Sequence, residues 1–122
     1  MAKILIVEDN EMNMRLFSDL VKSRGHAVFE CLQGSQALRM AQEIKPDLIL
    51  MDIQMPDVDG LTATKLIRQD KEIAKTKIIA VTAFAMPGDA DRILDGGLDD
   101  YISKPISVPK FLDTIEKALA EK

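Results

Sequence analysis

The sequence predicts a doubly wound α/β fold, with a five-stranded parallel sheet in the order 2-1-3-4-5. Five short apolar runs alternate with five amphipathic runs along the 122 residues, the pattern of repeated strand–helix units joined by right-handed crossovers. The first, third and fourth apolar runs contain ILIV, LILM and IIAV. Such nearly continuous apolar runs are typical of parallel strands covered on both faces. Of the two common doubly wound orders, 2-1-3-4-5 suits five strands.

Each predicted strand is a short apolar run that ends at a polar residue or a turn. The second, AVFEC, alternates apolar and polar residues and so suits an edge of the sheet. The predicted strands are Lys3–Glu8, Ala27–Cys31, Asp47–Asp52, Lys77–Thr82 and Asp100–Ser103.

The predicted helices follow from apolar residues at i, i+3, i+4 and i+7 spacing. The last is the clearest, with Ser107 as its expected N-cap and Pro109 tolerated in its first turn. Gly25 and the Gly96–Gly97 pair stand where helices are expected to stop. The predicted helices are Glu11–Arg24, Ser35–Glu43, Leu61–Asp70, Pro87–Asp95 and Val108–Ala120.

Composition narrows the class of protein. The net charge is −4 and basic residues are scattered, whereas a nucleic-acid-binding surface usually carries a basic stripe. Cys31 is the single cysteine and His26 the single histidine, so neither an intrachain disulfide nor a Cys/His zinc site is expected. No apolar run approaches the roughly 20 residues that span a bilayer, and no signal peptide is evident. We expect one cytoplasmic domain over residues 1–122, with no output domain, no nucleic-acid partner and no membrane insertion.

Polar side chains gather at the predicted carboxyl ends of four strands. Parallel strands end at one edge of a sheet, and doubly wound folds bind ligands there, where the strand order reverses. The first strand ends in Glu8 and Asp9, the third in Asp52 and the fourth in Thr82, and Lys104 follows the fifth. We therefore expect three acids, a hydroxyl and an ammonium group to meet at one edge.

This set of groups suits phosphoryl transfer assisted by a metal ion. Three convergent carboxylates repel one another unless a proton or a cation compensates them, and Mg²⁺ prefers such oxygen ligands while keeping several waters. Asp9 and Asp52 would bind it directly, Glu8 through water, and a backbone carbonyl just after Asp52 would complete the set. A carboxylate can also accept a phosphoryl group, and Asp52, on the middle strand, is the expected nucleophile. Lys104 and Thr82 would stabilise the phosphoryl oxygens.

Each of these residues taken singly has an ordinary structural explanation. Asp52 beside proline and glycine could cap a turn, and Glu8, Asp9 or Asn10 could cap the first helix. Lys104 alone would be a solvated surface lysine. The functional interpretation depends on all of them meeting at one edge with complementary charges.

The chain resembles the receiver domain of two-component response regulators. The resemblance lies in ILIVEDNEMN, PDLILMDIQMPDVDG, IIAVTAFAMPGD and DDYISKPIS, which occur in the family's order along nearly the whole chain. It implies a CheY-like, flavodoxin-like fold and phosphorylation of Asp52 by a histidine kinase or histidine phosphotransfer protein. It also implies Mg²⁺ bound by Glu8, Asp9, Asp52 and the Gln54 carbonyl, with Mn²⁺ able to substitute.

The resemblance carries three further expectations. The bond before Pro105 should be cis, which would hold the Lys104 backbone in place. Thr82 and Tyr101 match a switch pair, in which the hydroxyl moves toward the phosphate and the aromatic ring turns inward. The fourth helix, fifth strand and fifth helix would then meet a downstream protein.

Three segments, NEMNMRLFSDL, AVTAFAMPGDADRI and YISKPISVPKFLDTI, are similar to those of single-domain regulators of the bacterial cell cycle and polar development. Such a protein could be recruited to a cell pole by a kinase partner.

Three other functions remain open from the sequence. An aspartate-nucleophile phosphatase would carry a DxD pattern, but Gln54 stands at its second acid. A flavin mononucleotide binder would need a glycine- and hydroxyl-rich loop after the first strand, where this chain has EDNEMN. A receiver-shaped scaffold that never takes phosphate would also fit the fold.

Overall fold

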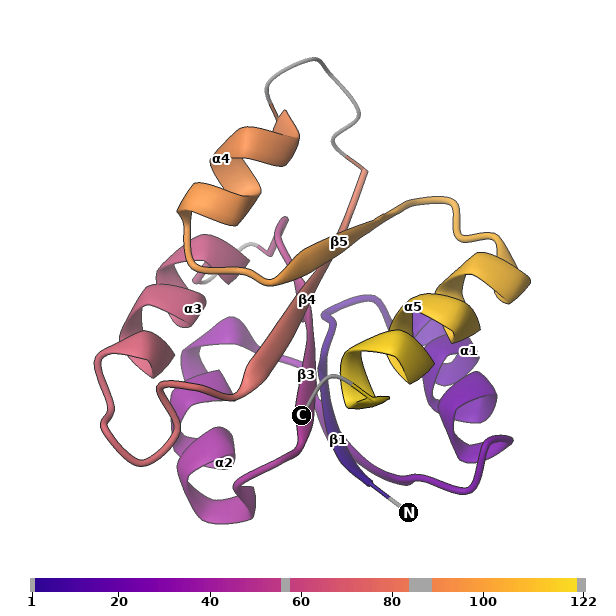
Figure 1. The fold of residues 1–122 in the computed structure, drawn as a ribbon, viewed down its shortest axis with the longest axis horizontal. Helices are drawn as coiled ribbons and strands as arrows, with labels where there is room; N and C mark the ends of the chain where they lie inside the picture. Colours follow the sequence, from indigo (N-terminus) through magenta and orange to yellow (C-terminus); the bar gives the residue numbers. More distant parts are fainter. Residues whose placement is uncertain (1, 56–57, 84–88, 121–122) are drawn as a thin grey trace.

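The computed structural model describes residues 2–55, 58–83 and 89–120. Its five parallel strands form one sheet in the order β2-β1-β3-β4-β5, as the sequence predicts (Figure 1). The second strand lies at an edge, in agreement with its alternating pattern. The strands are β1 (Lys3–Val7), β2 (Ala27–Cys31), β3 (Leu48–Asp52), β4 (Lys77–Thr82) and β5 (Asp100–Ser103).

Helices cover both faces of the sheet (Figure 1). One apolar cluster packs α2, α3 and α4 against one face, and a second packs α1 and α5 against the other. None of the helices in the described part of the chain is long and apolar enough to cross a membrane. The helices are α1 (Glu11–Lys22), α2 (Ala37–Ile44), α3 (Gly60–Arg68), α4 (Asp89–Asp95) and α5 (Val108–Ala120), and one turn of 3-10 helix, η1 (Gly34–Gln36), precedes α2.

Each face of the sheet has its own core because side chains alternate between the faces of a strand. On the α1 and α5 side, the rings of Phe17 and Phe111 stack with centroids 5.3 Å apart and are almost fully buried. All five residues of β3 are buried, as expected for the central strand. The middle of the sheet is therefore a rigid support for the residues at its carboxyl edge.

The helix ends follow local capping. The Asn10 side chain accepts a hydrogen bond from the Asn13 amide at 2.9 Å and caps α1. Asp59 caps α3 in the same way, through the Thr62 amide at 2.8 Å, so this helix begins at Gly60 and not at Leu61. It ends at Arg68, two residues before the predicted end.

Other boundaries differ from the prediction by a few residues. The predicted helix Ser35–Glu43 divides into η1 and α2, which continues to Ile44 and stops where Lys45 adopts a left-handed conformation, with φ of 52°. The first helix stops at Lys22, and Gly25 adopts a φ of 83° in the turn that follows.

The fourth helix is described from Asp89, and the predicted start at Pro87 lies outside the described residues.

The strand register places the candidate residues together. Val7 pairs with Met51, Asp52 with Val81, and Thr82 with Ser103. The residues that end β1, β3, β4 and β5 consequently lie at one edge of the sheet.

Candidate functional site

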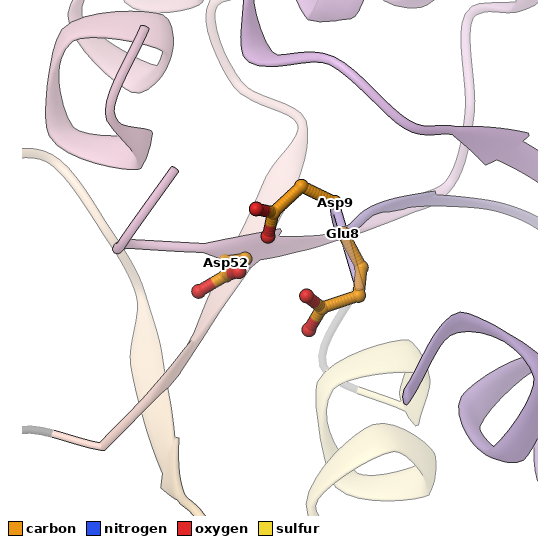
Figure 2. A group of neighbouring side chains, drawn as sticks. All are labelled: Glu8, Asp9 and Asp52. Carbon is orange, nitrogen blue, oxygen red and sulfur yellow. The ribbon is translucent and has the colours of Figure 1, made fainter. Parts of the chain in front are cut away.

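Three carboxylates meet at the carboxyl ends of β1 and β3. Glu8 and Asp9 follow β1, and Asp52 is the last residue of β3 (Figure 2). One carboxylate oxygen from each residue lies within 4.8 Å of the others. Glu8 and Asp52 are 1% and 2% exposed, whereas Asp9 is exposed to solvent. The structure thus brings together the three acids that the sequence predicts.

Lys104 lies beside the two buried acids. Its Nζ is 3.0 Å from Oε1 of Glu8 and 3.5 Å from Oδ1 of Asp52. The Lys104 side chain is 21% exposed, so its ammonium group compensates part of the negative charge in a partly desolvated place. The ion pair of Lys104 with Glu8 is not predictable from the sequence, because it depends on the side-chain direction after β5.

Backbone amides orient two of the carboxylates. The Asn10 amide donates to Oε2 of Glu8 at 3.1 Å, and the Gln54 amide donates to Oδ1 of Asp52 at 3.1 Å. Each acid therefore has one oxygen fixed by the loop that follows its own strand. Hydrogen bonds of this kind hold a carboxylate in one orientation, and the one from Gln54 acts to lower the pKa of Asp52.

Burial has the largest effect on the pKa of Asp52. Desolvation, together with the hydrogen bond and charge repulsion from Glu8, raises the pKa of Asp52 from 3.8 to about 7, although Lys104 and the Gln54 amide act in the opposite direction. A cation bound among the three acids would favour the ionised form of Asp52. The arrangement is therefore suited to a site whose negative charge is completed by a divalent ion.

Thr82 and Lys104 are joined through the backbone. The Lys104 amide donates to the Thr82 carbonyl at 2.8 Å, and Thr82 is fully buried at the end of β4. The Lys104–Pro105 peptide bond is cis, as the resemblance implies. The hydrogen bonding between β3 and β4 continues one residue past Asp52, because the Ile53 amide donates to the Val81 carbonyl at 3.3 Å.

Tyr101 lies on the edge strand β5 and is 38% exposed. It pairs with Ala80, while Thr82 pairs with Ser103 two residues further along. Because side chains alternate along a strand, Thr82 and Tyr101 point to the same face of the sheet, the face that α4 covers. This placement is compatible with the predicted switch pair.

Residues outside the acidic cluster have structural roles in the described part of the chain. Cys31 is buried at the end of β2 and its thiol donates to the Gln33 carbonyl. His26 accepts from the Ala2 amide through Nδ1 at 3.2 Å, and its Nε2 lies 3.2 Å from Glu116. His26 thus ties Ala2 to α5.

Comparison with known proteins establishes the family. Residues 4–116 match the model of the response regulator receiver domain, and the chain belongs to this family of signalling domains. Among curated relatives, the polar-differentiation response regulators DivK of Brucella anthropi and Brucella ovis are each 52% identical over 118 residues, which cover 97% of this chain and 96% of each relative.

Solved structures agree with the fold. The receiver domain of a sensor histidine kinase from Pseudomonas aeruginosa superposes with a TM-score of 0.90 at 34% identity, covering 98% of both chains; that crystal structure holds a magnesium ion in its active site cleft. The chemotaxis protein CheY4 of Vibrio cholerae superposes with a TM-score of 0.90 at 26% identity, covering 97% of this chain and 98% of that one.

Proposed function

We propose that the protein is a phosphoryl acceptor, in which Asp52 takes the phosphoryl group of a phosphohistidine and the modified protein signals through protein contacts. The observation that carries this proposal is the acidic cluster of Glu8, Asp9 and Asp52 with the Lys104 ammonium group 3.0 Å from one acid and 3.5 Å from another. Few structural roles require three acids and a lysine at the mouth of a buried strand.

Asp52 is the proposed nucleophile. A carboxylate oxygen of Asp52 would form the new bond to phosphorus as the bond from phosphorus to the donor's histidine nitrogen breaks, and the electron pair of that bond would stay on the imidazole. The Gln54 amide holds the Asp52 carboxylate in place. The Lys104 ammonium and the Thr82 hydroxyl, with the Gln54 and Ala83 amides, would receive the phosphoryl oxygens.

The residues of the cluster fit a magnesium ion. Carboxylate oxygens are the ligands that Mg²⁺ prefers, and Glu8, Asp9 and Asp52 with the Gln54 backbone carbonyl would hold it. When bound, the ion would neutralise the acids and offer open positions to phosphoryl oxygens. Mn²⁺, which takes the same kind of oxygen ligand, is expected to substitute.

Transmission of the signal to a downstream protein would depend on Thr82 and Tyr101. When Thr82 turns toward the phosphoryl group, space opens behind it, and Tyr101 would turn inward from its 38% exposed position. The surface formed by α4, β5 and α5 would then bind a downstream protein. Slow hydrolysis of the aspartyl phosphate by water would end the signal without a dedicated enzymatic activity.

The likeness to DivK supports a role in polar differentiation and the cell cycle, carried out by a cytoplasmic receiver domain. The donor would be a histidine kinase or a histidine phosphotransfer protein, and a kinase partner would recruit the protein to a cell pole. A pull-down from native lysate with phosphorylated protein and with the Asp52→Asn variant would identify partners that bind only the phosphorylated form.

Incubation with Mg²⁺ and acetyl phosphate tests the proposal. We expect the intact mass to rise by one phosphoryl group, with no rise for Asp52→Asn and a wild-type rise for Asp91→Asn, which removes an exposed acid of α4. Replacing Glu8 or Asp9 by its amide should raise the Mg²⁺ concentration needed for labelling.

The same assay separates the other functions. An unlabelled wild-type protein would favour a scaffold that never takes phosphate. Rapid release of inorganic phosphate would favour a phosphatase, and a yellow purified protein would indicate a flavin. Equal Mg²⁺ dependence in the Glu8 and Asp9 variants and the wild type would contradict the proposed ligands.

A further inference from the structure

The turn η1 passes so close to the β3–α3 loop, of which the structure describes residues 53–55 and 58–59, that no side chain fits at Gly34. A Cβ atom added to Gly34 would lie 2.1 Å from the Val58 carbonyl oxygen and 3.0 Å from Cε of Met55. Gly34 is buried, and its φ lies outside the left-handed region. The glycine is therefore required by the close approach of two backbones.

The β3–α3 loop would have to move if this space were filled, because η1 is held firmly. The Gln33 carbonyl accepts from the Cys31 thiol at 3.0 Å and from the Gln36 amide at 3.1 Å. Ala37 and Ala41, which follow in α2, are 0% exposed and pack into the core. On the other side of the contact, Val58 is only half-buried.

The same loop sets the geometry of the candidate site. The Gln54 amide donates to Asp52 at 3.1 Å, and the Gln54 carbonyl is a proposed metal ligand. At the far end of the loop, the Gly60 amide donates to the Ile53 carbonyl at 3.1 Å, and a Cβ on Gly60 would lie 2.3 Å from the Asp52 carbonyl oxygen. Two glycines thus allow close backbone contacts of this loop: Gly60 lies against the backbone of Asp52, and Gly34 lies against the carbonyl of Val58.

We propose that Gly34 is a positioning residue for the metal and phosphoryl site, although it belongs to a different strand–helix connection. Its missing side chain lets the β3–α3 loop lie where the Gln54 amide orients the Asp52 carboxylate and where the Gln54 carbonyl would reach a bound cation. The inference rests on the proposed function of Asp52.

The test compares Mg²⁺ affinity and acetyl phosphate labelling in the wild type and in Gly34→Ala. We expect Mg²⁺ affinity to fall about tenfold, as for other residues that orient metal ligands. Labelling should weaken at limiting Mg²⁺ and recover at high Mg²⁺. Gln36→Ala, an exposed change in the same turn, should behave as wild type.

Two further variants separate positioning from a general loss of stability. Ala41→Gly should destabilise α2 while keeping wild-type Mg²⁺ affinity. Met55→Ala removes the side chain nearest Gly34 and should weaken Mg²⁺ binding about tenfold, as for other supporting residues; it decides the question if Gly34→Ala does not fold.

Wild-type Mg²⁺ affinity in a folded Gly34→Ala variant would overturn this assignment and leave the proposed function intact. The same holds for wild-type affinity in Met55→Ala when Gly34→Ala fails to fold. A wild-type protein that neither binds Mg²⁺ nor takes phosphate would overturn the proposed function, and this assignment with it.

Discussion

At the scale of single residues, the buried Asp52 carboxylate controls the charge of the site. Its surroundings raise the pKa from 3.8 to about 7 because burial and Glu8 outweigh Lys104 and the Gln54 amide. Without a bound cation, the ionised form of Asp52 is therefore unfavourable in the folded protein. Charge that destabilises the folded protein is found most often at functional sites.

This shift predicts how stability depends on pH without divalent ions. Between pH 4 and 7 the folded state binds more protons at Asp52 than the unfolded state, so the free energy of unfolding should fall as pH rises through this range. Allowing for solvent screening of the charge, we expect Asp52→Asn to be about 1–2 kcal/mol more stable than the wild type at pH 8.

Urea unfolding at several pH values in the presence of a chelator measures this difference. Asp91→Asn serves as the control and should keep the wild-type slope with pH. If Asp52→Asn and the wild type respond to pH equally, Asp52 is not strained in the folded protein.

The Lys104 ammonium group already neutralises part of the negative charge that a bound cation would neutralise. Its contacts of 3.0 Å with Glu8 and 3.5 Å with Asp52 should oppose Mg²⁺ binding by about 1 kcal/mol, or roughly fivefold in affinity. We expect Lys104→Ala to bind Mg²⁺ more tightly by this factor and to remain open to labelling, but to lose the partner binding that depends on phosphorylation.

Titration with Mg²⁺ and a partner-binding assay check the two effects separately. Lys65→Ala, on an exposed position of α3 outside the proposed partner surface, is the matched control for loss of a lysine. Weaker Mg²⁺ binding in Lys104→Ala would mean that Lys104 organises the acids and does not compete with the cation.

At the scale of helices and strands, Arg68 joins the end of α3 to two neighbouring segments. Its guanidinium group donates to the carbonyls of Ala74, Thr76 and Gly97 at 2.7, 2.6 and 2.9 Å. It also contacts the Asp99 carboxylate at 3.0 Å, and the same Asp99 oxygen accepts from the Ile78 amide. Arg68 thus connects α3 with the starts of β4 and β5, at the edge of the sheet opposite the acids.

We expect Arg68→Ala to lower the free energy of unfolding by about 2–4 kcal/mol, because it leaves several partly buried carbonyls and Asp99 without their donor. Arg68→Lys should recover only part of this loss, since an ammonium group cannot reproduce the planar arrangement of donors. Denaturant unfolding measures both values. Mg²⁺ affinity should be unchanged, and a coupled loss of affinity would show that the two edges of the sheet are not independent.

The strands and their order were predictable from the sequence because their apolar runs are nearly continuous. Helix boundaries were less predictable: Asp59 shifted the start of α3, and the η1 turn replaced the predicted start of α2. Local capping and backbone geometry decide these positions, and they leave only weak traces in the order of residue types.

At the scale of the whole molecule, the fold explains why the acidic site could be predicted. A parallel sheet brings all carboxyl strand ends to one edge, so Glu8, Asp9, Asp52 and Lys104 could be placed together from their positions alone. The contacts of Gly34 and Arg68 could not be predicted in the same way. Each contact joins segments that are distant in the sequence. The residue type, glycine or arginine, does not indicate which segment it will contact.

The central claim is that the phosphoryl group is carried by Asp52. Reduction of the acetyl phosphate-treated protein with borohydride converts an aspartyl phosphate to homoserine, and peptide mass spectrometry then locates the modified residue. We predict homoserine at position 52 alone, dependent on Mg²⁺. Homoserine at another acid, or none in a protein that has gained a phosphoryl group, would contradict this account.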